Sequence, residues 1–180
     1  MSEKGIIFCT ELIPKILDGT KTVTRRCHKK LMYQPGDVLY LRECYIECEL
    51  EWFGHPGKMY SINGITYRAD MITVTAKNTS KPMPTVDGVL KQVGAWKSGR
   101  FMPKWAARPN RYLVVDARME PLWDITEEDA KREGVEPGNC AGGPYRNGFL
   151  IIWHKLNGRR PGWTWDNDPT VARYEFKEIK

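Results

Sequence analysis

The sequence predicts an α+β fold, built as a mixed β-barrel of about five to six strands with about two to four short flanking helices. Segments with strand character outnumber helical segments along the 180 residues, and no internal repeat is visible. The last alternating segment, residues 171–176, predicts a final strand that completes the barrel. These observations favour one sheet-rich fold with few helices.

The N-terminal part of the chain predicts a strand, a helix and two further strands. Residues 5–10 form a short apolar run, and an apolar stripe at helical spacing then ends at Gly19, a natural helix stop. Threonine and valine favour an extended chain over residues 20–26. A Pro-Gly-Asp turn at 35–37 precedes residues 38–43, whose period-two alternation is typical of a strand with two different faces.

The middle of the chain predicts a strand meander followed by a long insertion. Residues 65–69 and 72–75 have strand character and are separated by Asp70. Residues 78–100 carry Pro, Gly, Ser and Lys with little periodicity, so we expect a long surface loop there. Loops of this size in compact domains are often functional, which makes this one a candidate lid.

The C-terminal part predicts a strand, two helices and the closing strand. Residues 111–118 are β-rich, and Thr126 with Asp129 forms a helix-capping pair that starts a short helix ending near Gly134. A second helix is predicted by an apolar stripe that stops at Gly158 and comprises Phe149, Ile152, Trp153 and Leu156. We expect this second helix to pack through that stripe.

Composition indicates a single globular domain over the whole chain, with a long loop insertion near 78–100. Hydrophobic residues make up 41% and charged residues 28%, far from the signature of disorder. Lys and Arg outnumber Asp and Glu by 28 to 22, a formal net charge of +6 that attracts anions such as phosphate. Much of the excess lies in residues 25–30 and 97–111, although solvated surface charge explains such clusters equally well.

Neither the N-terminus nor the cysteines indicate export or a metal centre. Only a short apolar run, residues 6–9, follows the polar start, so we expect no signal peptide, no membrane span and a cytoplasmic location. The five cysteines are irregularly spaced and are expected to be free thiols. The best candidate metal ligands are Cys27, His28, Cys44 and Cys48. Their spacing lacks the close pairs that are usual in metal sites, so we expect no metal and no cofactor.

The sharpest local feature is segment 19–26, Gly-Thr-Lys-Thr-Val-Thr-Arg-Arg. A glycine bend is followed by an amine, a hydroxyl and a guanidinium, those of Lys21, Thr24 and Arg26. Such a group binds a ligand or acts on it. On a flat strand Lys21 and Thr24 face opposite sides, so their joint action requires a bend or bulge near Thr22.

This Gly-x-Lys-x-x-Thr-x-Arg stretch resembles the signature of the ASCH family, in which a helix and a glycine-containing turn lead into Lys, then Glu or Thr, then Arg. The likeness spans nearly the whole chain, apart from residues 78–99 and 138–146, and continues in segments 33–39, 67–70, 102–108 and 175–177. The chain is similar to the larger ASCH proteins common in phage and prophage genomes. The resemblance implies a PUA-like barrel with a cleft for a nucleobase, a nucleoside or an RNA segment.

One branch of small bacterial ASCH proteins hydrolyses N4-acetylcytidine to cytidine and acetate, and has Thr where other members often have Glu. By this resemblance the chain is an amidohydrolase, with Lys21, Thr24 and Glu133 as its catalytic set. Glu133 is placed by the likeness of residues 124–133 to the family's helix. Glu127 and Glu128 remain alternatives for the third catalytic position. We expect four substrate-binding residues: Arg26, Tyr67, Arg68 and Trp105.

The chemistry of such a set makes one demand on Lys21. Thr24 is a weak nucleophile until a base removes its proton, and Lys21 takes that proton only if its pKa falls well below its ordinary value. Burial and the neighbouring cations Arg25 and Arg26 act in that direction. Thr24 then attacks the acyl carbonyl while Glu133 helps to protonate the leaving amine. Water activated by Lys21 and Glu133 is the alternative nucleophile.

A non-catalytic RNA- or nucleotide-binding module explains the same residues. Lys21 and Arg26 are then phosphate contacts, Thr24 is an ordinary strand residue and Glu133 is an exposed helix charge. Aromatic residues are available to stack on bases, namely Tyr67, Trp96 and Trp105. A ribonuclease that uses Lys21 as acid or base is a third alternative. We expect a monomer whose partner is a nucleoside or nucleobase, with RNA as a further partner and no membrane.

Overall fold

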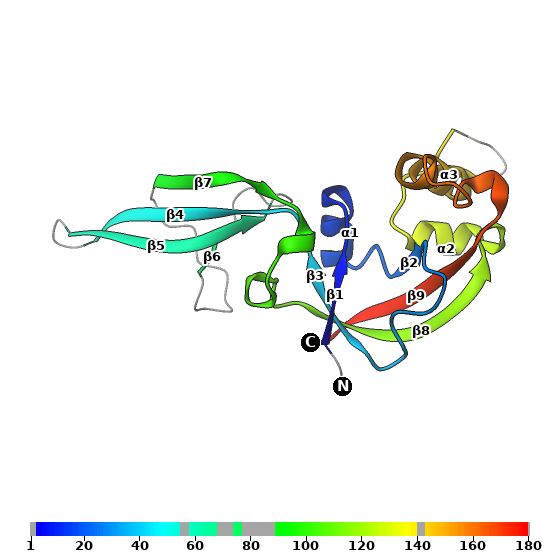
Figure 1. The fold of residues 1–180 in the computed structure, drawn as a ribbon, viewed down its shortest axis with the longest axis horizontal. Helices are drawn as coiled ribbons and strands as arrows, with labels where there is room; N and C mark the ends of the chain where they lie inside the picture. The colour runs from blue at the N-terminus through cyan, green and yellow to red at the C-terminus, as the bar shows by residue number, and fades with distance from the viewer. Residues whose placement is uncertain (1–2, 55–57, 68–73, 77–88, 140–142, 180) are drawn as a thin grey trace. The chain divides into compact units, whose positions relative to one another are not determined.

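A computed structural model describes residues 3–54, 58–67, 74–76, 89–139 and 143–179 of the chain (Figure 1). In this part of the chain the strands form two sheets, one of five strands and one of four, accompanied by the helices α1, α2 and α3. The α+β fold class is therefore confirmed.

The five-stranded sheet is mixed and open. Its strands lie in the order β1-β3-β8-β9-β2, with bounds β1 Glu3–Ile7, β2 Val23–Arg26, β3 Val38–Arg42, β8 Arg111–Pro121 and β9 Thr170–Ile179. The predicted closed barrel is wrong for these strands, because β1 and β2 are edges of the sheet and do not pair with each other. The C-terminal strand β9 was expected to complete a barrel, but it lies inside the sheet between β8 and β2. Both edge strands are short, which is one way in which proteins limit unwanted pairing at a sheet edge.

Contacts between backbone segments divide the chain into two compact units. The first unit contains residues 1–4, 15–38 and 112–180, and the second contains residues 5–14 and 39–111. Each unit is assembled from segments that are distant in sequence. The single-domain organisation therefore stays a prediction.

The core of the first unit gathers around α2 (Glu127–Arg132) and α3 (Pro144–Asn157). Its buried residues come from both helices, from the segments before and after α2 and from β9: Leu122, Ile125, Ala130, Val135, Phe149, Trp153 and Val171. The predicted capping pair is confirmed, because the backbone N–H of Asp129 donates to Thr126 Oγ1 over 3.1 Å. The helical turn then ends at Gly134, whose φ of +73° favours glycine.

Helix α3 confirms most of the predicted apolar stripe. Phe149 and Trp153 are buried, and Ile152 packs against the same core. Leu156 is 52% exposed, so its place in the packed stripe is wrong. Among the described residues, no helix has both the length and the apolar character needed to cross a membrane.

The N-terminal helix is confirmed as a short element, formed by the 3-10 turn η1 (Thr10–Leu12) and the helix α1 (Ile13–Leu17). Ile13 and Ile16 are buried, as the apolar stripe predicts. Gly19 follows with a φ of +80°, so it acts as the expected helix stop.

The second unit contains a four-stranded sheet, of which the sequence predicted only the parts near residues 65–69 and 72–75. Strands β4 (Tyr45–Gly54) and β5 (Lys58–Tyr67) pair antiparallel from one end to the other. Strand β6 (Val74–Ala76) pairs with β5, and β7 (Val89–Lys97) pairs with β4. The expectation of an unbroken loop over residues 78–100 is therefore wrong for β7, where ladder hydrogen bonds to β4 hold the chain extended. The preceding residues 78–88 lie outside the described part.

Candidate functional site

Strand β2 carries the predicted site residues and has two different faces. It pairs antiparallel with β9, so that Thr24 lies opposite Tyr174 and Arg25 lies opposite Arg173. The pairing extends regularly to Thr22, whose carbonyl accepts the N–H of Phe176 over 2.9 Å. Because neighbouring side chains of a strand alternate, Arg25 and Arg173 share one face, which we call the Arg25 face. Thr24 lies on the other, which we call the Thr24 face.

Lys21 meets Glu133 on the Arg25 side of β2, although 112 positions separate them in the sequence. Its Nζ donates to Glu133 Oε2 over 2.6 Å, to the Glu133 carbonyl over 2.8 Å and to the Val23 carbonyl over 2.8 Å. Gly134 makes this approach feasible, because a Cβ there would lie 3.0 Å from Lys21 Cβ in a backbone conformation that side chains rarely adopt. The structure thus brings together two of the three predicted catalytic residues.

The surroundings of Lys21 oppose its predicted role as a base for Thr24. Its three hydrogen bonds match the three donors of an ammonium group, and one acceptor is a carboxylate, so the contacts stabilise the charged form. Lys21 is only 1% exposed. Thr24 is not among its acceptors and lies on the opposite face of the strand. The bend that joint action of Lys21 and Thr24 requires is replaced by regular pairing with β9.

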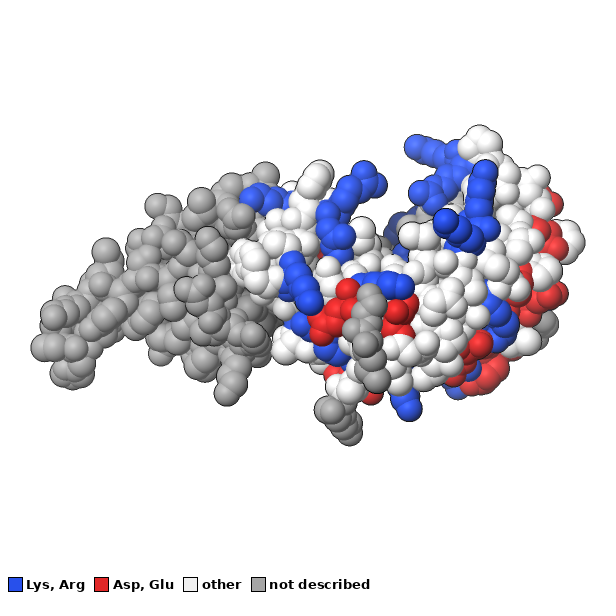
Figure 2. Space-filling view, turned by 60° about the horizontal axis from the view of Figure 1, so that its bottom comes forward, with Lys and Arg blue, Asp and Glu red and all other residues white. Residues whose placement is uncertain are grey.

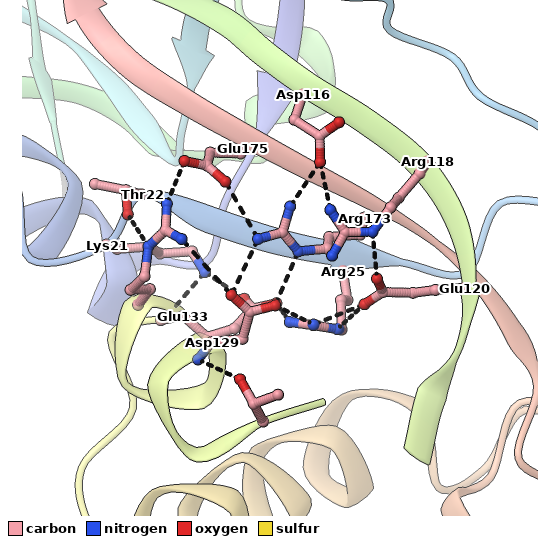
Figure 3. A network of polar contacts seen from close by, with 12 residues as sticks. Lys21, Thr22, Arg25, Asp116, Arg118, Glu120, Asp129, Glu133, Arg173 and Glu175 are labelled. Carbon is pink, nitrogen blue, oxygen red and sulfur yellow. Dashed lines mark hydrogen bonds and ion pairs between the residues drawn. The ribbon is translucent and has the colours of Figure 1, made fainter. Parts of the chain in front are cut away.

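The Arg25 face is neutralised by carboxylates (Figure 3). Arg25 Nη2 lies 2.6 Å from Glu120 and 2.7 Å from Asp129. Arg173 binds the same Asp129 carboxylate through two nitrogens, at 2.9 and 3.0 Å, so this aspartate lies between two arginines. Further ion pairs extend the network, which then contains as many cations as carboxylates. The cations are Lys21, Arg25, Arg118, Arg132 and Arg173, and the carboxylates are Asp116, Glu120, Asp129, Glu133 and Glu175.

The charges of this network fix the ionisation of Asp129. Burial opposes its negative charge, but hydrogen bonds and charges from Arg173 and Arg25 outweigh burial and hold the pKa of Asp129 well below its ordinary value. The same contact, with Asp129 as its main charged partner, raises the pKa of Arg173 despite burial. Asp129 and Arg173 are therefore both charged at neutral pH, which fits a structural role for their contact.

The Thr24 face has different neighbours. Thr24 is 4% exposed, and within the described part of the chain no hydrogen bond occupies its hydroxyl. Tyr174, on the same face, accepts the N–H of Met32 at its hydroxyl over 2.9 Å and lies 3.3 Å from His28 Nδ1. Burial, together with the charge of Arg26, lowers the pKa of His28, so this imidazole is neutral at pH 7.

The segment that follows β2 is cationic. Cys27 Sγ and Arg160 Nη1 both contact the side-chain oxygen of Asn157, at 3.1 and 3.4 Å, which brings Arg160 beside the residue after Arg26. Lys29 and Lys30 follow and are exposed. Within the described part of the chain, neither these lysines nor Arg160 forms an ion pair with a carboxylate. Lys29, Lys30 and Arg160 therefore add positive charge beyond the end of β2 that no carboxylate of the described residues pairs with.

Three glutamates were considered as partners of Lys21, and their positions separate them. Glu133 is 5% exposed, so its interpretation as an exposed helix charge is wrong. Glu127 instead accepts the backbone N–H groups of Tyr145 and Arg146, at 3.0 and 2.8 Å, and so caps the N-terminus of α3. Glu128 is exposed on α2. Of the three, only Glu133 meets Lys21.

The remaining predicted site residues belong to the second unit or to its undescribed part. Tyr67 is 1% exposed and donates its hydroxyl hydrogen to the Ala106 carbonyl over 2.8 Å. The Arg108 guanidinium covers its ring at 4.2 Å, so that ring is occupied from within the protein. Trp105 is 44% exposed, and Arg68 lies outside the described residues.

Sequence reasoning missed Arg25, Asp129 and Arg173, the centre of the buried network. The sequence did carry a signal for such an ion-pair network. Arg25 alternates with Thr24 on one strand, the last strand contains Arg173, and the first turn of α2 is acidic. In the described ranges, no three His, Cys, Asp or Glu side chains are placed to hold a metal ion together.

Comparison with known proteins gave no match to a family model, to a curated protein or to a solved structure. The function is therefore argued from the geometry of the chain itself.

Proposed function

We propose that this chain is a nucleotide- or RNA-binding protein of the PUA-like ASCH type, with a phosphate-binding site at the Thr24 face and the end of β2. One observation carries the proposal: β2 directs Arg25 into carboxylates that neutralise it, whereas Lys29, Lys30 and Arg160, which lie just beyond β2 or beside Cys27, form no ion pair with a carboxylate in the described part of the chain.

The groups at this site suit a phosphorylated nucleoside. Guanidinium groups bind phosphate oxygens with charge-assisted hydrogen bonds, which are stronger than neutral ones. The Thr24 hydroxyl both donates and accepts, and a neutral His28 offers one donor and one acceptor, so both suit the polar edge of a base or sugar. Figure 2 shows one group of cationic side chains, at the upper right of the displayed face, that stands away from carboxylates, while other cations lie beside carboxylates. Unpaired positive charge attracts an anionic ligand.

The test is calorimetric titration with cytidine 5′-monophosphate and, separately, with cytidine. We expect the phosphorylated ligand to bind more tightly than cytidine. This difference in affinity should shrink between 50 and 200 mM salt, because salt screens charge attraction beyond a Debye length of about 10 Å at 0.1 M. Arg160→Gln should weaken the monophosphate about tenfold. Lys177→Gln is the matched control, because Lys177 is an exposed cation of the same unit. Equal losses in both variants would contradict a defined site.

The Lys21–Glu133 contact favours a second candidate function, hydrolysis of N4-acylated cytidine. Because Thr24 lies on the opposite face, the contact supports attack by water rather than by Thr24. Glu133 would take a proton from the water, and Lys21 would stabilise the oxyanion as the carbonyl carbon becomes tetrahedral. The C–N bond then breaks, and the same proton passes to the leaving amine, giving cytidine and acetate. To donate to the oxyanion, Lys21 Nζ must release one of its present hydrogen bonds.

This second function is tested by measuring cytidine release from N4-acetylcytidine. Turnover that is lost in Glu133→Gln but kept in Glu128→Gln would support it, since Glu128 is an exposed carboxylate of the same helix. Circular dichroism spectra of both variants check that they fold. Absence of turnover by the unaltered protein, with nucleotide binding intact, would leave the binding function alone.

A further inference from the structure

A second surface with nucleic-acid chemistry lies in the second unit, on the 3-10 turns η2 (Gly99–Phe101) and η3 (Lys104–Ala106). Phe101 is 70% exposed and Trp105 is 44% exposed. A cation directly precedes each aromatic residue in the sequence: Arg100 before Phe101, and Lys104 before Trp105. We call these four residues the aromatic–basic surface.

The backbone beneath these side chains is held in place. The hydroxyl of Tyr45 donates to the Phe101 carbonyl over 3.1 Å, and the Arg42 side chain donates to the Arg100 carbonyl. Gly99 lies so close to β3 that a Cβ on it would meet the Arg42 carbonyl carbon and oxygen at 2.9 Å. Between the two turns Met102 is buried in the core of the unit, as are Ala106 and Ala107. The turns are thus anchored, while both large aromatic side chains remain outside the core.

The charge around this surface is positive. Residues 97–111 contain five cations, Lys97, Arg100, Lys104, Arg108 and Arg111, and no acidic residue. Glu43, a carboxylate packed against this segment, is buried and already pairs with Arg108 Nε at 2.6 Å. The Arg100 guanidinium forms no ion pair in the described part of the chain. An anionic partner would therefore be attracted without first breaking an ion pair of the Arg100 guanidinium.

We propose that the aromatic–basic surface binds single-stranded nucleic acid, with bases stacked on Phe101 and Trp105 and phosphates held by Arg100 and Lys104. Single strands expose the faces of their bases and carry regularly spaced negative charge, so they match aromatic rings interleaved with cations. A protein partner would match the two aromatic residues and Arg100 but not Lys104, because lysine is depleted at protein interfaces. The inference goes beyond the nucleotide site of β2 and uses none of its residues.

The test uses fluorescence anisotropy with labelled 12-residue oligonucleotides of RNA and DNA, each single-stranded and as a duplex. We expect both single strands to bind and the duplexes to bind more weakly. Trp105→Ala and Phe101→Ala should each weaken single-strand binding about tenfold, whereas Trp105→Phe should retain most of it because a ring remains. Leu156→Ala is the control, since Leu156 is an exposed apolar residue of the first unit.

The cations are tested by the salt dependence of the same titration. Arg100→Gln and Lys104→Gln should each reduce the slope of log K against log salt by about 0.7, the value for one phosphate contact on a single strand. Equal binding of duplex and single strand, equal behaviour of Trp105→Ala and Trp105→Phe, or no binding of oligonucleotides would overturn the inference. Preferential binding to anionic lipid vesicles would overturn it too.

The two surfaces fail independently. If Arg160→Gln leaves mononucleotide binding unchanged while Trp105→Ala weakens the oligonucleotide, the proposed site at β2 is wrong and the aromatic–basic surface stands. The reverse result removes the aromatic–basic surface and leaves the site at β2.

Discussion

Arg25 and Arg26 are neighbours in sequence, yet the protein surrounds them differently. Arg25 is buried and lies within 2.7 Å of two carboxylates. Arg26 is half-buried on the other face of β2 and begins the cationic segment that ends with Lys30. The two arginines of this run therefore have different surroundings, because the alternation of a strand turns Arg25 into the carboxylate network and Arg26 to the other face, where we propose a phosphate site. Changes on the two faces should have different consequences.

The largest effect should come from the centre of the buried network. Asp129→Asn leaves Arg25 and Arg173 without the carboxylate that they share, and breaking a buried pair in this way typically costs about 3–5 kcal/mol. We expect the urea midpoint of unfolding to fall accordingly. Asp124→Asn is the control, since Asp124 is an exposed aspartate close in sequence. A loss below about 1 kcal/mol would show that the network resembles surface ion pairs.

Lys21→Met should destabilise less than Asp129→Asn. The change removes one cation from Glu133 but leaves Arg25 Nη1 at 3.4 Å as a second partner of that carboxylate. The methionine also fills most of the space of the lysine stem, so we expect a loss of about 2–3 kcal/mol in urea unfolding. If Lys21 instead served only a substrate, its replacement would leave the midpoint unchanged and abolish turnover alone.

Acid should act on the same network with a defined sign. The pKa of Asp129 is lower in the folded than in the unfolded state, so its contribution is complete above the unfolded value of about 4 and is lost as the pH falls below it. The urea midpoint should drop between pH 5 and pH 3. The drop should be smaller in Asp129→Asn, which has no carboxyl group to protonate. Parallel pH curves for the two proteins would contradict this origin.

Local signals predicted helices better than they predicted the sheets. The pair Thr126 and Asp129 located α2, and Gly158 marked the end of α3, because caps and stops act within a few residues. The open sheet was not predictable in this way, because the place of β9 between β8 and β2 depends on contacts between distant segments. Strand β4 does carry a local signal, the alternation of glutamates with apolar residues over 46–52. Gly94 within β7 weakens the corresponding signal there.

The sequence predicted which residues belong to the candidate site better than it predicted which of them lie in contact. Resemblance named Lys21 and Glu133, and the structure places them in contact. Periodicity alone indicated that Lys21 and Thr24 face opposite sides of a flat strand, and this is the arrangement that regular pairing with β9 produces. The carboxylates that surround Arg25 come from β8 and α2, so no spacing near the motif reveals them.

The smallest expected effect lies on the Thr24 face, at His28. Burial and the charge of Arg26 lower its pKa below the ordinary 6.5, so as the pH falls through 6.5 the unfolded state takes up the proton first and stability decreases slightly. Arg26→Gln removes the charge but not the burial, so the pKa of His28 should rise part of the way toward 6.5. Titration of the imidazole resonances by NMR measures this shift, with the exposed His154 as an internal reference. An unchanged His28 midpoint in Arg26→Gln would mean that the Arg26 charge does not reach His28, and the proposed phosphate site would lose the cation at its centre.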